Sequence, residues 1–175
     1  MLAALLGTHG FGLPAGLAVV RDPSAEWAAG AEALIAALPP ALSWQHAGST
    51  AVPGLPAKPI CDLVGLAPTE QVLAELVAPL EALGFLALGE FGIPGRSFFR
   101  LRREGVDYAH LHTYVTGHPD AESVLAFRDA LRRDTALRDA YAATKFAALA
   151  AHPQSRDAYT AAKAPFIRNQ LQRGR

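Results

Sequence analysis

The stretch HAGSTAVPGLPAKPICD, residues 46–62, contains residue types that bind phosphate groups. Gly48 allows the backbone to approach a bulky ligand, and Ser49, followed by Thr50, offers a hydroxyl beside a free backbone N–H. Three prolines make the rest of the stretch too stiff for a helix or an inner strand, so it must cross the surface on a restricted path to Lys58. The sequence therefore predicts a phosphate-binding loop.

Asp62 follows this loop inside the apolar run PICDLVGL. Burying a carboxylate is costly unless a metal ion, a cation such as Lys58 or backbone donors compensate it. A purely structural role, in which Asp62 accepts from loop N–H groups, is the alternative to a functional one. The chain's single cysteine, Cys61, lies in the same run and is expected to be a small buried apolar residue.

Two histidines lie in the segment DYAHLHTYV. Side chains alternate along a strand, so His110 and His112 share one face and could bind a metal ion or a phosphate. A His-x-His pattern alone does not establish a site, because two ordinary half-buried histidines give the same pattern. Together with Asp62 on another strand, it predicts a metal or catalytic site made of Asp62, His110 and His112.

Basic residues cluster in the segment GIPGRSFFRLRR. A guanidinium beside a glycine-rich bend suits bidentate phosphate contact, and Arg96 and Arg100 are expected to contact the ligand. Arg102 and Arg103 are expected to serve the solubility of a hairpin. Asp107 is expected to be a solvated turn residue.

Two pairs, Tyr141/Lys145 and Tyr159/Lys163, each have the i, i+4 spacing of one helix face. Such a face could stack a base or sugar on the phenol and pair a phosphate with the ammonium, so Lys145 and Lys163 are candidate ligand-binding residues. Lysine stems that merely cover packed tyrosines would give the same pattern. The apolar positions of these helices are expected in the core: Phe127, Leu131, Leu137, Phe146 and Leu149.

Hydrophobic periodicity and turn signals predict the elements that position these residues. The expected helices are 25–38, 69–83, 122–133, 135–151 and 155–173, and the expected strands are 42–47, 59–66, one from Phe85, and a hairpin of SFFRLRR and VDYAHLHTYV. This order predicts one α+β domain over 1–175, in which a mixed sheet packed with helices is followed by a helical part over 120–175. Residues 1–18 are expected to be an irregular extension.

The bulk composition restricts the partners. Lys+Arg 16 against Asp+Glu 16 gives a formal net charge of +0, so no overall field attracts nucleic acid or an anionic membrane. Neither a signal core nor a membrane span is evident, and a cytoplasmic location is expected. The expected partner is a small phosphorylated molecule or a nucleotide.

Several segments together resemble the GrpB-like family, over roughly residues 19–172. The matching segments are HAGSTAVPGLPAKPICDLVG, RDPSAEW, GIPGRSFFR, HLHTYV, FRDALRRD, YAATK and YTAAKAPFI. The resemblance implies a nucleotidyltransferase-like fold of the polymerase-β type. The signature of that superfamily is Gly-Ser, then about nine to thirteen residues, then Asp-x-Asp on a strand. Twelve residues separate Ser49 from Asp62 here.

The chain departs from that signature at the other acids. Val64 occupies the place of the second carboxylate, and the strand of His110 and His112 occupies that of the third. A two-metal site normally uses three acids to hold two Mg²⁺ ions, whereas imidazole prefers Mn²⁺ or Zn²⁺. Either one different metal is bound, or a phosphorylated ligand binds without the usual chemistry.

Three functions remain open from the sequence. The first is a nucleotidyltransferase-like enzyme that binds a nucleoside triphosphate and a divalent metal (Mg, Mn or Zn) and transfers a nucleotidyl group to a small-molecule acceptor. The second is a non-catalytic module that binds a nucleotide or phosphometabolite at a degenerate active site. The third, metal-dependent phosphoester hydrolysis, depends only on the histidine pair.

Overall fold

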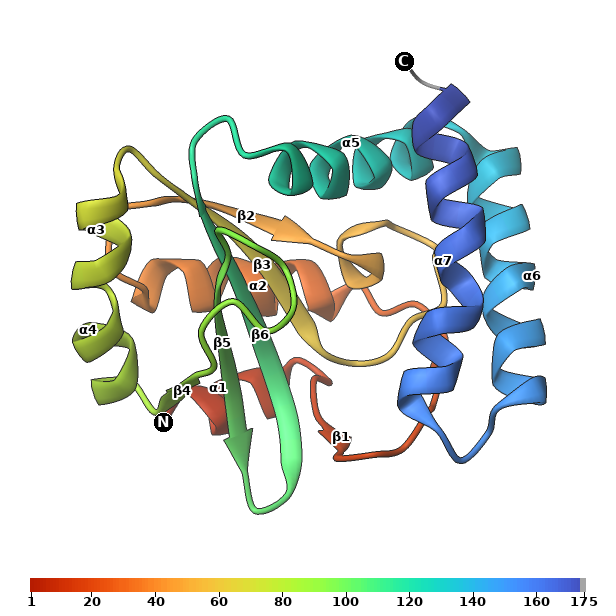
Figure 1. Cartoon of the computed structure of the whole chain (residues 1–175). Coiled ribbons are helices and arrows are strands. Elements are labelled where there is room, and N and C mark those ends of the chain that lie inside the picture. The colour runs from red at the N-terminus through yellow and green to blue at the C-terminus, as the bar shows by residue number, and fades with distance from the viewer. Residues whose placement is uncertain (174–175) are drawn as a thin grey trace.

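A six-stranded mixed sheet forms the centre of the molecule in the computed structural model, which describes residues 1–173 (Figure 1). The strand order is β2-β3-β6-β5-β4, and the short β1 pairs with the start of β6. Only β3 and β6 are parallel among the described strand pairs. The strands are β1 (Leu13–Pro14), β2 (Ser43–Ala47), β3 (Cys61–Ala67), β4 (Phe85–Ala87), β5 (Ser97–Arg103) and β6 (Val106–Val115).

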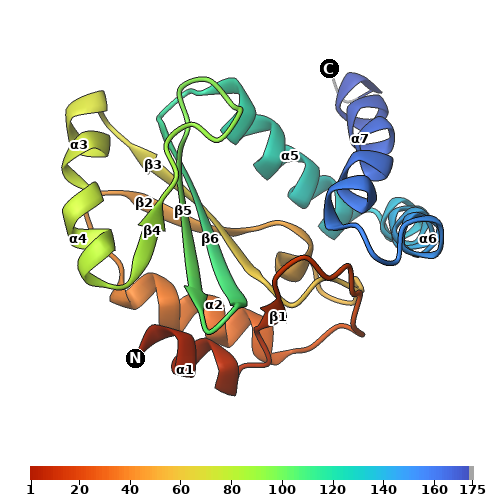
Figure 2. The ribbon, with the colours of Figure 1, turned by 60° about the horizontal axis from the view of Figure 1, so that its bottom comes forward.

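One face of the sheet carries the main hydrophobic core. Alternate residues of the central strands, such as Leu63, Phe99 and Leu111, are fully or almost fully buried there. Helices cover this face: α1 (Leu2–Thr8), α2 (Glu26–Ala37), α3 (Glu70–Glu75) and α4 (Val77–Ala82). Figure 2 shows α1 and α2 beneath the sheet, on the side away from α5.

The opposite face carries Asp62, His110 and His112, because these positions alternate with the core positions. Three helices enclose this side, α5 (Pro119–Arg133), α6 (Thr135–Ala151) and α7 (Arg156–Arg173), and α6 and α7 lie side by side (Figures 1 and 2). The Asp134 side chain begins α6 by accepting from the Leu137 N–H. The predicted α+β class, with a mixed sheet packed with helices and followed by C-terminal helices, is confirmed.

Several predicted elements differ in detail from the structure. Residues 1–18 are not irregular throughout, because α1 packs Leu2 and Leu6 into the main core and β1 joins the sheet. The expected helix 69–83 is divided at Leu76 into α3 and α4. Helix α5 begins at Pro119, earlier than expected, since proline is well tolerated in the first turn.

Three side-chain predictions are wrong: the exposure of Asp107, a role of Arg102 in solubility alone, and the burial of Phe146. Asp107 is fully buried, where it accepts from Arg102 Nε at 2.6 Å and from Arg156 Nη1 at 2.6 Å. A register shift between Leu101 and Arg102 brings Arg102 opposite Asp107, and Arg156 comes from the distant helix α7. Phe146 is 47% exposed because the buried face of α6 contains Tyr141, Lys145 and Ala148 instead.

The structure agrees with other expectations. Cys61 is buried, and Phe127 and Leu131 lie in a second core cluster with Tyr141. Among the described residues, no helix is both long and apolar enough to cross a membrane.

Candidate ligand and metal site

Asp62, His110 and His112 converge on one point of the sheet. Asp62 on β3 pairs in register with His110 on β6, and Val64 pairs with His112. Asp62 Oδ1 lies 3.2 Å from His110 Nδ1 and 3.7 Å from His112 Nε2. One ligand atom from each residue lies within 4.8 Å of the other two, a spacing compatible with a single metal ion.

The carboxylate at this point is held in its ionised form. Burial acts to raise the pKa of Asp62, but the hydrogen bonds and positive potential of His110 and His112 outweigh it and hold the pKa well below its usual range. The Asp62 side chain is 31% exposed, so one side of the carboxylate remains accessible. An ionised, accessible carboxylate beside two imidazoles is a suitable donor set for a divalent cation.

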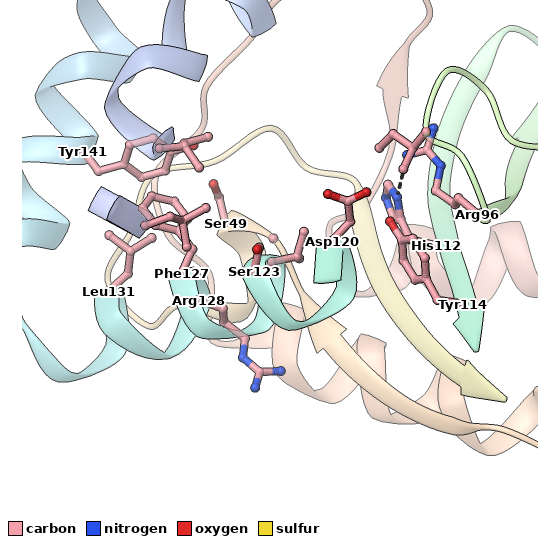
Figure 3. Close-up of a pocket in the computed structure, with 15 residues that line it drawn as sticks. Ser49, Arg96, His112, Tyr114, Asp120, Ser123, Phe127, Arg128, Leu131 and Tyr141 are labelled. Carbon is pink, nitrogen blue, oxygen red and sulfur yellow. Dashed lines mark hydrogen bonds between the residues drawn. The ribbon is translucent and has the colours of Figure 1, made fainter. Parts of the chain in front are cut away.

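Arg96 makes the two histidines differ in their availability to a metal ion. Its Nη1 lies 3.2 Å from His112 Nδ1, and because a guanidinium can only donate, Nδ1 must accept (Figure 3). Neutral His112 therefore carries its proton on Nε2, the nitrogen that faces Asp62, and has no lone pair there for a metal. His110 Nδ1 donates to the ionised Asp62, so His110 can bind a metal beside Asp62 once its proton moves to Nε2. His112 can bind one only after Arg96 releases its Nδ1.

Arg96 is therefore placed as a positioning residue. It is buried, and it also donates to the carbonyl oxygens of Glu90 and Phe91 and lies over the Phe98 ring. The sequence predicted ligand contact for this guanidinium, but most of its donors hold the glycine-rich loop and His112. Arg96 still lines an apolar pocket described below.

The Gly48–Ser49 step lies directly against Asp62. Gly48 has a φ of 68°, and a Cβ there would lie 2.6 Å from Asp62 Oδ2, so only glycine fits without displacing the carboxylate. Ser49 begins a short 3₁₀ turn, Ser49–Ala51. The Thr50 hydroxyl lies 3.0 Å from His46 Nε2, and burial lowers the pKa of His46 to about 4, which keeps that imidazole neutral.

A cavity of about 200 Å³ opens beside Asp62 and contains every lysine of the chain. Lys58 comes from the loop, Lys145 from α6 and Lys163 from α7. Lys58 and Lys163 place their Nζ atoms 5.4 Å and 4.3 Å from the centre of the Tyr159 ring. Asp62 is the only carboxylate among the lining residues: Gly48, Ser49, Thr50, Lys58, Ile60, Asp62, His110, Tyr141, Lys145, Tyr159, Thr160 and Lys163.

The charged form of each lysine is destabilised in this cavity. Burial, followed by repulsion from Lys163, lowers the pKa of Lys145 to about 7, and Lys145 Nζ donates to the Pro56 carbonyl. Burial and repulsion from Lys58 lower the pKa of Lys163 to about 8, although Asp62 opposes the shift. Burial likewise lowers the pKa of Lys58. When all three lysines are protonated, Asp62 is the one carboxylate of the lining that offsets their charge, so a bound anion would favour the protonated forms.

A second, mostly apolar pocket of about 350 Å³ adjoins the lysine cavity through Gly48, Ser49 and Tyr141. Figure 3 shows Phe127, Leu131 and Tyr141 grouped at one end, and His112 and Arg96 at the other. Asp120 and Ser123 of α5 add polar groups. Arg128 also lines the pocket, but its guanidinium donates to Gln45 and to the His46 carbonyl, which ties α5 to β2.

The sequence analysis did not identify this pocket. Asp120 and Ser123 carry no motif and reach the site only because α5 crosses the sheet there, whereas Tyr114 follows His112 on the same face of β6. The remaining predicted residue is Arg100. It lies on β5, where it pairs with His110 of β6, and it lines a third cavity on the other side of that histidine.

The chain matches the family model described as "GrpB protein" over residues 18–173. The protein belongs to the GrpB family. A GrpB relative, a UPF0157 protein of Pseudomonas aeruginosa, is 41% identical over 139 residues, which cover 78% of this chain and 57% of that protein. YqkA of Bacillus subtilis is 32% identical over 130 residues, 74% of this chain and 38% of that protein. The chain thus spans about half the length or less of these two curated GrpB relatives.

Solved structures agree on the fold. The conserved protein GrpB from Enterococcus faecalis superposes with a TM-score of 0.75 at 29% identity, over 89% of this chain and 98% of that one. The Cid1 poly(U) polymerase in its MgGTP-bound form superposes with a TM-score of 0.51 at 11% identity, over 86% of this chain and 48% of that one. This GrpB protein therefore has a nucleotidyltransferase-like fold.

Proposed function

We propose that this GrpB protein binds a nucleoside triphosphate, with the phosphates in the lysine cavity and the nucleoside in the adjoining apolar pocket. The observation that carries the proposal is the convergence of all three lysines on one cavity beside Asp62 and the Gly48–Ser49 loop. The remaining cationic side chains of the chain are arginines.

A polyphosphate fits this cavity electrostatically. Burial removes the water that would stabilise the three ammonium groups and lowers their pKa values. Repulsion adds to this effect, from Lys163 on Lys145, from Lys58 on Lys163 and from Arg156 on Lys58. An anion bound among the three ammonium groups compensates their charge in a site of low dielectric, where charge-assisted hydrogen bonds are strong. The Ser49 hydroxyl and nearby backbone N–H groups add donors for phosphate oxygens.

The apolar pocket fits the organic part of the ligand. It shares Ser49 and Tyr141 with the lining of the lysine cavity, so the two cavities are adjacent and the proposed ligand would extend from one into the other. Its aromatic and aliphatic walls suit a nucleobase, and Asp120 and Ser123 offer groups that can bind the edge of a base or a ribose hydroxyl. Fold likeness to a polymerase crystallised with MgGTP is consistent with a nucleotide here.

Asp62 and His110 are the proposed metal ligands, and His112 joins them if Arg96 moves. Bound there, a divalent ion such as Mn²⁺ would neutralise charge on the phosphate oxygens next to the Gly48 loop. Lys58, Lys145 and Lys163 would orient the terminal phosphates, so that an acceptor attacks the α-phosphorus and pyrophosphate leaves. The proposed reaction is therefore the transfer of a nucleotidyl group to a small-molecule acceptor.

A non-catalytic nucleotide-binding module is the second candidate, and Val64 favours it. Val64 is fully buried between Ala47 and Tyr114, so no second carboxylate is available on β3 at the usual position. In that case the lysines bind phosphate without metal, and Asp62 only fixes the histidines.

Isothermal titration with each of the four nucleoside triphosphates, with Mg²⁺, with Mn²⁺ and with EDTA, tests both candidates. We expect micromolar binding of at least one triphosphate and at least a tenfold loss in Lys163→Met, with no change in the control Arg103→Met. A tenfold gain from Mn²⁺ that disappears in Asp62→Asn supports transfer, and equal binding with EDTA supports the module. Absence of heat for every triphosphate would remove both.

A further inference from the structure

A third cavity, of about 410 Å³, lies across His110 from the lysine cavity. His110 is the only residue that lines both of them, so the two cavities meet at the proposed metal ligand. We call this third space the arginine cavity after its principal side chains, Arg100, Arg102 and Arg156. None of the functions described above uses it.

The sheet register fixes the geometry of the arginine cavity. Asp62, His110 and Arg100 are direct neighbours on the adjacent strands β3, β6 and β5. Arg100 thus lies on the side of His110 that faces away from Asp62 and the lysines. A ligand that contacts Arg100 can extend along this row of side chains to His110 and Asp62, the proposed metal ligands.

Arg100 is the unpaired cation of the arginine cavity. Asp107 accepts from both Arg102 and Arg156, whereas Arg100 Nε is buried and finds no hydrogen-bond partner within residues 1–173. A buried donor without a partner is costly, and a guanidinium is especially suited to a planar, bidentate acid group. The lining carries three arginines and two aspartates, Asp107 and Asp157, so an anion completes its charge balance.

Phe91 supplies an apolar surface at the same place. Its side chain is 60% exposed, stacks on Phe98 with ring centres 5.2 Å apart, and lies 5.7 Å from the Arg100 guanidinium carbon. Its φ of 45° is unfavourable for a bulky residue, and Arg96 Nη2 holds the conformation by donating to the Phe91 carbonyl at 2.7 Å. The loop therefore keeps an aromatic ring exposed beside an unpaired cation.

We infer that the arginine cavity binds the acid group, a carboxylate or a phosphate, of the second substrate that accepts the nucleotidyl group. That the bound molecule is the acceptor depends on the proposed function. That the cavity binds an anion depends only on its shape, on Arg100 and on Phe91. The acid group would contact Arg100, an apolar or aromatic part would lie against Phe91, and the reactive end would reach His110.

Two probes, benzoate and phenyl phosphate, distinguish the kind of acid, and neutral benzyl alcohol controls for apolar binding alone. Each is titrated into the protein without nucleotide or metal and followed by backbone amide NMR shifts. We expect at least one acid to shift the amides of Phe91 and Ser155–Asp157 with a millimolar Kd, and benzyl alcohol to bind at least tenfold more weakly.

Variants separate this site from the lysine cavity. Arg100→Gln should weaken the acid at least tenfold and Arg100→Lys less, whereas Arg103→Met, on an exposed arginine outside the cavity, should have no effect. Lys145→Met should leave the acid bound, although it impairs triphosphate binding. Unchanged acid binding in both Arg100 variants, or acid binding lost only in Lys145→Met, would overturn the inference. If the wild-type protein binds the acid but no triphosphate, only the proposed function is overturned.

Discussion

Asp62 and His110 face each other in register across the parallel strands β3 and β6, with 3.2 Å between Oδ1 and Nδ1. This pairing fixes the site, because the lysine cavity and the arginine cavity both open onto His110. The only parallel pairing described in the sheet thus brings together residues that are 48 positions apart in the chain.

The two histidines should contribute unequally to metal binding. Arg96 donates to His112 Nδ1 and keeps the proton on Nε2, whereas the hydrogen bond of His110 Nδ1 is to Asp62, which a metal ion would bind in its place. We expect His110→Ala to weaken Mn²⁺ binding about 10- to 100-fold and His112→Ala by no more than a few-fold. Mn²⁺ titration followed by electron paramagnetic resonance measures both, and equal losses would contradict the assignment.

The lysine cavity should give its amines unusual reactivity. Lys145, with a pKa of about 7, and Lys163, with a pKa of about 8, are largely or partly neutral near pH 8, and only a neutral amine is a nucleophile. Mass spectrometry after limited acetylation at pH 8 should find Lys163 modified, with the fully buried Lys145 slower. Adding ATP and Mn²⁺ should protect Lys163 at least several-fold. Unchanged labelling with saturating nucleotide would place the phosphates elsewhere.

The stability of the fold should rise with pH because of Lys145. Its folded pKa is about 7, below the ordinary 10.5, so the unfolded chain binds more protons between these values and the free energy of unfolding increases with pH across that window. One such group contributes at most about 1.4 kcal/mol per pH unit. Urea unfolding at pH 7.5 and 9 should show a smaller increase in Lys145→Met than in the wild type or Arg103→Met. An identical increase in all three proteins would argue against a buried, displaced pKa.

Gly48→Ala should impair the site beyond its backbone cost. An added Cβ would lie 2.6 Å from Asp62 Oδ2, and the positive φ disfavours alanine by roughly 1 kcal/mol. Gly117→Ala is the matched control, because Gly117 also has a positive φ, of 86°, but no atom within 4 Å of the added carbon. Thermal unfolding and Mn²⁺ titration of both variants are compared. We expect similar backbone penalties but loss of metal binding in Gly48→Ala alone; equal metal binding would show that Asp62 tolerates the displacement.

The sequence was sufficient for the main elements and for the residues that converge on Asp62. Two local patterns predicted this convergence: the alternation that places His110 and His112 on one face of a strand, and the spacing between Gly48-Ser49 and Asp62. The tyrosine and lysine pairs also marked the correct helix faces, but not that Lys58, Lys145 and Lys163 meet in one cavity, which depends on how α6 and α7 pack.

The rest of the site depends on long-range geometry that local patterns do not encode. The burial of Asp107 required a register shift and an arginine from α7, and the tautomer of His112 required Arg96 to fold back from its loop. The expected exposure of Asp107 and burial of Phe146 were wrong for this reason. The apolar pocket likewise appears only when α5 crosses the sheet.

A crystal soaked with a nonhydrolysable triphosphate and Mn²⁺ would show directly whether the ligand occupies the lysine cavity. We expect an anomalous Mn²⁺ peak within about 2.3 Å of an Asp62 oxygen and a His110 nitrogen. We also expect phosphate density among Lys58, Lys145 and Lys163, and the base beside Phe127 and Tyr141. Phosphates bound at another surface, with the lysine cavity empty at saturating ligand, would contradict the proposed function.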